Sequence, residues 1–209
     1  RWNSALGPGA WRSPLAQRGY EVHGIEASEA MVEQLRAKAG GDDIPVSIGD
    51  FAGLDIQGKF SLVYVVFNTF FALISKEDQV RCFSNVAGRL REGGVFVIEA
   101  FVPDMTRWDW SWRIETSYVG DDSVVLDAAR HDPVEQRVAS THLVVSRAGV
   151  KMYPVLLRYA WPSELDLMVR LARLRLRGRW GGWRREPFAA SSIKHVSVYE
   201  RLKCPLVDG

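Results

Sequence analysis

The sequence has few cysteines and no long hydrophobic segment. Two of its 209 residues are cysteines, Cys82 and Cys204, which cannot form a disulfide framework and do not have the spacing of a metal site. No apolar run reaches the roughly 18 residues that a membrane span requires. The first residues, RWNSALGPGA, lack the apolar core of a signal peptide. We therefore expect a cytoplasmic protein that has no bound metal and no membrane partner.

An excess of one charge is also missing. Lysine and arginine number 27 and aspartate and glutamate 25, so the formal net charge is +2, and the chain as a whole does not attract nucleic acid. Its 47% hydrophobic residues suffice for a packed core. The length suits one domain with a subdomain.

The first half of the chain alternates short apolar segments with helical patterns. Phe60–Phe67, FSLVYVVF, has no polar alternation, which is typical of a strand covered on both faces. Lys76–Leu90 has apolar residues at helical spacing, and Glu92-Gly93-Gly94 is expected to end this helix. This alternation predicts an α/β fold with a mostly parallel sheet. Further strands are expected at Tyr20–Ile25, Ile44–Ile48 and Val95–Ala100, with a helix over Ala30–Ala39 after Ser28 as its N-cap.

Glu26 stands at the end of the apolar run Tyr20–Ile25, immediately before the next helical pattern. In doubly wound folds, an acid at this place holds the ribose of a nucleoside, because a carboxylate can accept two hydrogen bonds from a vicinal diol. One β-α unit after Glu26, Asp50 can accept a hydrogen bond from an exocyclic amine such as that of adenine. Phe51 beside it offers an apolar face to the same ring. A solvated loop acid and an ordinary Gly-Asp turn are the alternatives.

After Pro103 the pattern changes to antiparallel strands. Val124–Val145 alternates around the turn Asp132–Glu135, and Val150–Tyr159 follows as another strand. A helix is expected to begin at Ser163 as its N-cap, and Leu174–Trp180 with His195–Arg201 predicts a final antiparallel pair.

Four motifs in this order carry a family resemblance: EVHGIEASEAM, VSIGDF, FSLVYVVFNTF and LREGGVFVIEAFVP. The series resembles a class I S-adenosylmethionine-dependent methyltransferase of the small-molecule branch. The resemblance implies a doubly wound, Rossmann-like, mostly parallel seven-stranded sheet with a reversed last strand and an antiparallel flap inserted after the fifth strand. It also implies S-adenosylmethionine as cofactor, bound by Gly7, Gly9, Glu26, Ala27, Asp50, Phe51, Phe67 and Asn68.

The glycine loop departs from the family pattern. Ala5-Leu6 precedes Gly7-Pro8-Gly9-Ala10, with neither the usual acid nor a third glycine. Only six residues precede Gly7, so we expect that an amino-terminal segment belongs before Arg1. Gly7 and Gly9 could also form an ordinary turn.

The expected organisation has three parts: a cofactor-binding core over residues 1–103, a flap over residues 104–160 and a closing helix and strand pair over residues 161–209. The flap carries aromatic residues suited to an apolar acceptor, to a small core of its own or to a homodimer contact. They are Trp108, Trp110, Trp112 and Tyr118.

The predicted activity is transfer of a methyl group to nitrogen or oxygen of a small, natural-product-like acceptor. The cofactor is already an electrophile, so the protein has mainly to align the reactants and exclude water. A general base would help a hydroxyl acceptor, and the candidates are His131 at the hairpin turn and His142 in the next strand.

Three alternatives remain open. The arginine-rich stretch Arg170–Arg185 could bind the phosphate of RNA or of a nucleotide sugar. A solvent-exposed helix face and an edge strand protected by its charges are the simpler interpretation. The degenerate glycine loop leaves room for a scaffold or binding protein with weak or no catalysis. A nicotinamide dehydrogenase shares the glycine turn and the ribose acid, but the chain offers no second catalytic domain.

Overall fold

The computed structural model describes residues 14–37, 41–42, 44–53, 56–108 and 111–202. The chain divides into two compact units, residues 1–58 and residues 59–209, which are described separately. No helix among the described residues is long and apolar enough to cross a membrane.

The first unit contains a parallel strand pair joined by a helix. Its elements are α1 (Pro14–Gln17), β1 (Gly24–Glu26), α2 (Glu29–Arg36) and β2 (Val46–Ile48). Gly24 pairs with Val46 and Glu26 with Ile48, so both strands end at the same edge. The expected N-cap is confirmed: Ser28 Oγ accepts the Met31 N–H of α2 at 3.4 Å. Both strands are shorter than the apolar runs that predicted them.

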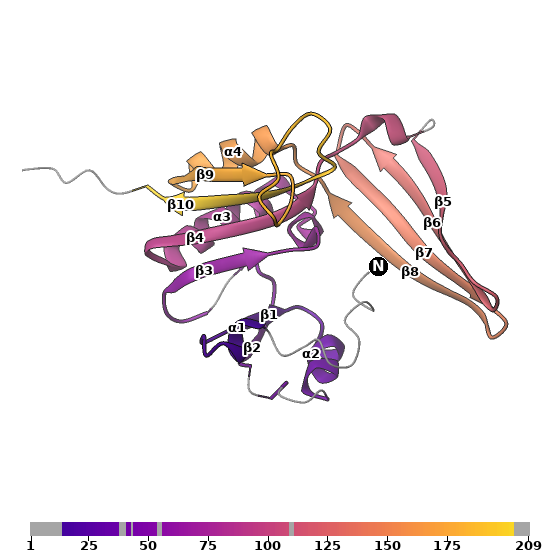
Figure 1. Cartoon of the computed structure of the whole chain (residues 1–209), viewed down its shortest axis with the longest axis horizontal. Helices are drawn as coiled ribbons and strands as arrows, with labels where there is room; N and C mark the ends of the chain where they lie inside the picture. The colour runs from indigo at the N-terminus through magenta and orange to yellow at the C-terminus, as the bar shows by residue number, and fades with distance from the viewer. Residues whose placement is uncertain (1–13, 38–40, 43, 54–55, 109–110, 203–209) are drawn as a thin grey trace, which may run out of the picture. The chain divides into compact units, whose positions relative to one another are not determined.

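The core of the second unit is a four-stranded sheet in the order β3-β4-β10-β9 (Figure 1). Its strands are β3 (Phe60–Val65), β4 (Leu90–Phe101), β9 (Leu174–Trp180) and β10 (Lys194–Arg201). β3 runs parallel to β4, and β10 runs antiparallel to both of its neighbours, as expected for a reversed last strand.

Two helices, α3 (Lys76–Arg89) and α4 (Pro162–Leu171), contact each other and the sheet. At the centre of the core, the ring of Phe83 on α3 lies 5.2 Å from Phe70, 5.6 Å from Phe96 and 5.7 Å from Tyr199. Aromatic contacts of this geometry contribute beyond the area that they bury.

Two expected boundaries were wrong. Glu92-Gly93-Gly94 does not end α3, because the helix stops at Arg89 and β4 begins directly at Leu90. A Cβ on Gly94 would lie 2.8 Å from the carbonyl oxygen of Phe60, so glycine lets the two strands approach. Ser163 is not the N-cap of α4; Trp161 occupies that position and Pro162 begins the helix, where its missing N–H needs no partner.

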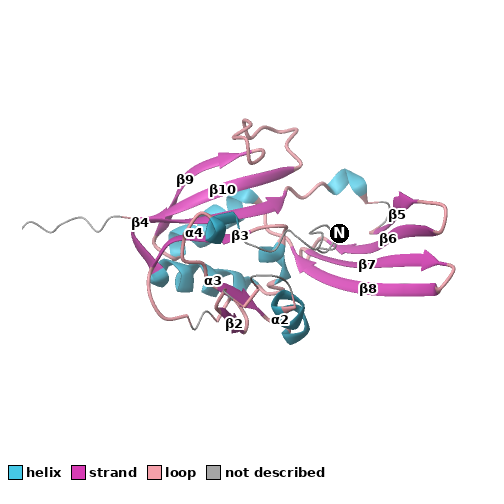
Figure 2. Cartoon of the chain, turned by 60° about the horizontal axis from the view of Figure 1, so that its bottom comes forward, coloured by secondary structure: helices cyan, strands magenta, loops and turns pink. Residues whose placement is uncertain are grey.

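A second sheet of four consecutive antiparallel strands lies between β4 and α4 in the chain (Figure 2). The strands are β5 (Trp112–Val119), β6 (Ser123–Asp132), β7 (Arg137–Ser146) and β8 (Gly149–Arg158). The turn after Asp132 is where the sequence predicted it, and Asp132 Oδ1 accepts the N–H groups of Val134 and Glu135 at 3.0 Å each. The sequence did not predict β5.

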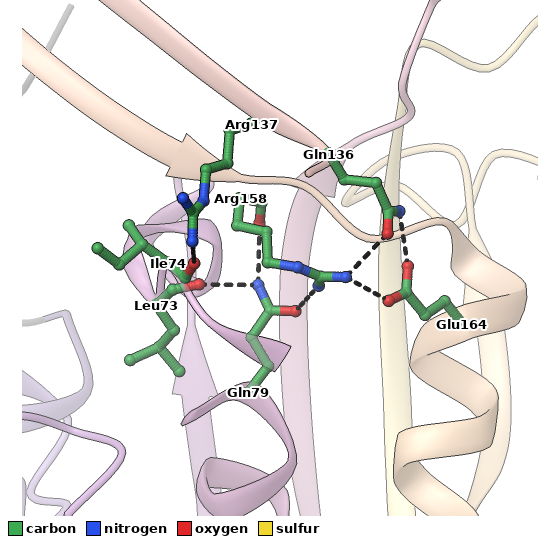
Figure 3. A network of polar contacts seen from close by, with 7 residues as sticks. All are labelled: Leu73, Ile74, Gln79, Gln136, Arg137, Arg158 and Glu164. Atoms are coloured by element: carbon green, nitrogen blue, oxygen red, sulfur yellow. Dashed lines mark hydrogen bonds and ion pairs between the residues drawn. The ribbon is translucent and has the colours of Figure 1, made fainter. Parts of the chain in front are cut away.

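A buried arginine joins this antiparallel sheet to the core (Figure 3). Arg158, at the end of β8, is 2% exposed. Its guanidinium donates to Gln79 of α3 at 2.5 Å, to Gln136 in the β6–β7 turn at 2.8 Å and to Glu164 of α4 at 2.7 Å. Gln79 in turn donates to the carbonyl oxygens of Leu73 and Arg158. One side chain therefore connects the turn and both helices.

The Arg158→Met substitution should destabilise the fold by about 3–5 kcal/mol, because it leaves partly buried Glu164 without its cation. Urea unfolding followed by circular dichroism measures the change. The control is Arg147→Met, which removes the exposed ion pair to Asp122 and should cost at most about 1 kcal/mol. Equal effects of the two substitutions would contradict the role assigned to Arg158.

Candidate active site

In the first unit, one acid lies at the carboxyl end of β1 and another just after β2. The Gly49 N–H donates to the carbonyl oxygen of Glu26 at 3.0 Å, so Asp50 follows directly beside the end of β1. Both carboxylates are oriented by the chain that follows them: Glu26 Oε1 accepts the Ser28 N–H at 2.9 Å, and Asp50 Oδ1 accepts the Ala52 N–H at 2.8 Å. This edge can offer two carboxylates to hydroxyl or amine donors.

The neighbours of these acids differ in exposure. Ala27 is exposed and Phe51 is half-buried. Gly7 and Gly9 lie outside the described residues, so the structure does not place the expected glycine loop.

In the second unit, Phe67 and Asn68 form a tight corner after β3. Both have positive φ, 56° and 62°, which costs about 1–3 kcal/mol for each non-glycine residue and requires support from the surroundings. The side chain of Phe67 is 65% exposed. Phe70 and Phe71, in the following 3₁₀-helix η1 (Thr69–Ala72), are fully buried in the core.

Glu99 on β4 supplies much of that support and was not predicted from the sequence. Its side chain is buried, and Oε2 accepts the Phe67 N–H at 3.2 Å while Oε1 lies 3.3 Å from Lys194 Nζ. Its carbonyl oxygen accepts the Asn68 N–H at 3.3 Å. Asn68 Oδ1 accepts the Phe101 N–H at 2.7 Å. The only signal in the sequence is an acid within the otherwise apolar run VFVIEA.

His131 lies in a buried aromatic cluster at the base of the antiparallel sheet. Its Nε2 is 2.9 Å from the Tyr159 hydroxyl, and its ring stacks on Trp108 with centroids 4.8 Å apart. Met105 Sδ lies 3.8 Å from the same hydroxyl. Burial lowers the pKa of His131 below its usual value of 6.5, against an opposing effect of Asp132. The imidazole is therefore neutral at pH 7 and can accept a proton.

His142 lies on β7, farther from the end of the antiparallel sheet that carries His131. It pairs across the strands with Asp127, whose carboxylate contacts His142 Nδ1, and its side chain is 24% exposed. A carboxylate at Nδ1 orients the ring and leaves Nε2 available for other contacts. His131 pairs with Val138 of β7. His142 lies four residues farther along the same strand, a distance of about 13 Å. The structure thus does not bring the two histidines together.

Of the four aromatic residues expected on the flap, the three that the structure describes lie apart from one another. Trp108 packs on His131, and the Arg113 guanidinium lies 5.5 Å from the Trp108 ring centroid. Trp110 lies outside the described residues. Trp112 and Tyr118 are both exposed, but the register places them on opposite faces of the antiparallel sheet.

Comparison with known proteins identifies the family. A methyltransferase-domain family model matches residues 3–94. The CcbJ methyltransferase from Streptomyces caelestis is 37% identical in sequence; the match covers 95% of this chain and 81% of that one, with a TM-score of 0.86. The chain belongs to the class I S-adenosylmethionine-dependent methyltransferases.

Two further relatives agree with this assignment. The cypemycin N-terminal methyltransferase of a Streptomyces species is 28% identical over 196 residues, which cover 93% of this chain and 80% of that protein. CalS10, an amino pentose methyltransferase from Micromonospora echinaspora solved with S-adenosylmethionine bound, shares the fold at 22% identity and a TM-score of 0.68, over 94% of this chain and 80% of that one. This methyltransferase is an enzyme with a Rossmann-like fold and uses S-adenosylmethionine as cofactor.

The arginine-rich stretch of the methyltransferase is largely engaged within its own fold. Arg179 makes a two-point contact with Asp166 at 2.6 and 3.2 Å and donates to Ser197 at 2.8 Å. Arg175 pairs with Glu200 at 2.6 Å, and the Arg185 guanidinium lies 5.5 Å from the Trp180 ring centroid. These contacts favour the structural interpretation of the stretch over phosphate binding.

Glu99→Ala should destabilise the methyltransferase by about 1–3 kcal/mol, because the N–H of Phe67 in its strained corner loses its acceptor. The same urea unfolding experiment measures the change. Glu92→Ala, on an exposed position of the same strand, should stay within about 0.5 kcal/mol of the unsubstituted protein. The assigned role of Glu99 is wrong if both variants unfold at the same urea concentration.

Proposed function

We propose that this methyltransferase transfers the methyl group of S-adenosylmethionine to a nitrogen of a small, natural-product-like acceptor. Support for a nitrogen acceptor comes from three similar proteins. The cypemycin N-terminal methyltransferase is named for an N-terminus, CalS10 is an amino pentose methyltransferase, and KedS8 is a sugar N-methyltransferase of the same fold. An oxygen acceptor is the second possibility that the resemblance allows.

The observation that carries the cofactor site is the pair of oriented carboxylates at one strand edge. We assign Glu26 to the ribose hydroxyls, because its carboxylate lies at the carboxyl end of β1. Asp50 is assigned to the adenine amine. The other proposed cofactor contacts in the first unit are Gly7, Gly9, Ala27 and Phe51, and those in the second unit are Phe67 and Asn68.

The bound cofactor supplies an electrophilic methyl carbon, so the chain's own residues have to hold the acceptor, exclude water and remove a proton. We assign proton acceptance to His131, since burial lowers its pKa and keeps the ring unprotonated at pH 7, and its Nε2 lies beside the Tyr159 hydroxyl. β8 contacts η1, the helix that begins directly after Asn68. The base of the antiparallel sheet therefore adjoins the corner assigned to the cofactor. His142, oriented by Asp127, is the second candidate.

The proposed organisation keeps residues 1–103 and 161–209 as a cofactor-binding core with a single seven-stranded sheet. Residues 104–160 form a flap that covers the acceptor. The sheet β3-β4-β10-β9 with its reversed strand β10 supports the Rossmann-like core, and the antiparallel sheet β5–β8 supports the flap.

An acceptor panel tests the proposed function directly. Purified protein is incubated with S-adenosylmethionine and amino sugars, peptides with free N-termini, phenols or a short RNA. The expected result is release of S-adenosylhomocysteine and a mass increase of one CH₂ unit on an amine. Methylation of RNA alone would overturn the proposal, and so would the absence of turnover together with no binding of S-adenosylhomocysteine, the result expected of a scaffold.

Glu26→Ala should weaken binding of S-adenosylhomocysteine at least tenfold, about 1.4 kcal/mol, because hydrogen bonds from a diol to a charged acceptor are lost. Isothermal titration calorimetry measures the affinity. Glu29→Ala, in the exposed first turn of α2, is the matched control and should bind as the unsubstituted protein does. Unchanged affinity in Glu26→Ala would remove Glu26 from the site.

With an acceptor from the panel, His131→Gln should lower kcat by about 10² or more, the usual contribution of a general base. In the unsubstituted enzyme His131 should contribute an acid limb below about pH 6.5, because burial lowers its pKa; protonation of the acceptor amine itself sets a separate limb at higher pH. This acid limb should disappear in His131→Gln and persist in His142→Gln. The opposite pattern would assign the base to His142.

A further inference from the structure

The guanidinium of Arg113 lies on the same face of the antiparallel sheet as His131. Arg113 is on β5, where it pairs across the strands with Ala129 of β6. His131 follows two residues later on β6, and alternate residues of a strand share a face. The cross-strand rows of Arg113 and His131 are therefore neighbours, about 7 Å apart along the strands.

Trp108 connects these two side chains. Its ring stacks on the imidazole of His131 with the ring centroids 4.8 Å apart. The Arg113 guanidinium lies 5.5 Å from the centroid of the same tryptophan ring, close enough to be attracted by the quadrupole of the indole. Trp108 thus holds the guanidinium beside the imidazole that we assign as the proton acceptor.

One donor of Arg113 lacks an acceptor. The Arg113 side chain is 20% exposed, and its Nε is shielded from solvent without a hydrogen-bond partner among the described residues. The other members of its cross-strand row are Ala129, Ser140 and Val155, none of which carries a carboxylate. A shielded donor on a charged group is unfavourable unless an acceptor reaches it, so this donor points to a ligand.

The ion pairs around Arg113 leave positive charge unbalanced. Glu115 contacts Arg113 at 3.1 Å, and the same carboxylate oxygen lies 3.1 Å from Arg107. Asp127, which pairs with Glu115 across the strands, contacts His142 instead. Two guanidiniums therefore share a single carboxylate, and this cluster can accept one further negative charge.

A carboxylate fits this arrangement better than a phosphate. A guanidinium binds a carboxylate through two parallel N–H donors, and the single charge of a carboxylate matches the single unbalanced positive charge. A phosphate monoester carries nearly twice that charge. We propose that Arg113 binds a carboxylate of the acceptor, so that the molecule methylated on nitrogen also bears an acid group. The inference rests on the proposed function, because it takes the molecule beside His131 to be the methyl acceptor.

Matched acceptor pairs test the proposal. Dipeptides are compared with their C-terminal amides, and an amino sugar is compared with the corresponding amino uronic acid and with its phosphate ester. In the unsubstituted enzyme the KM of the carboxylate should be lower than that of its neutral counterpart by about tenfold or more, because a charge-assisted contact is added. In Arg113→Met the two KM values should differ by less than about twofold, since the partner of the carboxylate is gone.

Two further variants complete the test. Arg113→Lys retains the charge without the planar pair of donors, so the preference for the carboxylate should be intermediate. Arg147→Met, in the turn between β7 and β8, is the matched control and should keep the full preference. Circular dichroism verifies that each variant is folded.

Calorimetry with the same compounds, in the presence of S-adenosylhomocysteine, separates this inference from the proposed function. Equal KM and equal affinity for acid and amide in the unsubstituted protein would overturn the assignment of Arg113 and leave nitrogen methylation standing. Affinity for acids that Arg113→Met abolishes, without methylation of any amine, would overturn the proposed function and retain the carboxylate site. Tighter binding of the phosphate ester than of the uronic acid would overturn the choice of a carboxylate.

Discussion

The second unit of this methyltransferase depends on a guanidinium that is buried at the end of β8. Arg158 contacts the turn between β6 and β7 and both helices of the core. Burial of a charge is costly unless every donor is satisfied, so the surrounding side chains are held to one arrangement. That arrangement determines where the antiparallel sheet begins, and hence where His131 and Tyr159 lie in relation to η1.

A second constraint acts at the corner after β3. Two successive residues with positive φ are tolerated because Glu99 and the Asn68 side chain satisfy the backbone groups of that corner. Such strain is found at ligand-binding sites, where a rigid scaffold holds a local conformation that the chain would not adopt alone. In the first unit, Glu26 and Asp50 are oriented more simply, by the N–H groups that follow them in the chain.

The two faces of the antiparallel sheet divide its roles. One face carries both histidines that the sequence proposed as bases, and the other carries Trp112, Ile114 and Met152. The sequence indicated aromatic residues in this region without dividing them between the two faces. Trp112 and Tyr118 are six residues apart and would share a face of a regular strand. The register shift between Thr116 and Tyr118 in β5 places them on opposite faces.

The sequence by itself determined the family, the alternation of strands and helices, and the acids at the ends of β1 and β2, because these depend on local periodicity and short motifs. Ser28 as a cap and the strands Leu174–Trp180 and His195–Arg201 were predictable for the same reason. Only the tertiary structure decided the roles of Arg158, Glu99 and Arg179. Their partners lie far away in the chain: Gln79 is 79 residues from Arg158, and Phe67 is 32 residues from Glu99. Contacts between such distant residues form only once the sheets have paired, and no local pattern in the sequence encodes them.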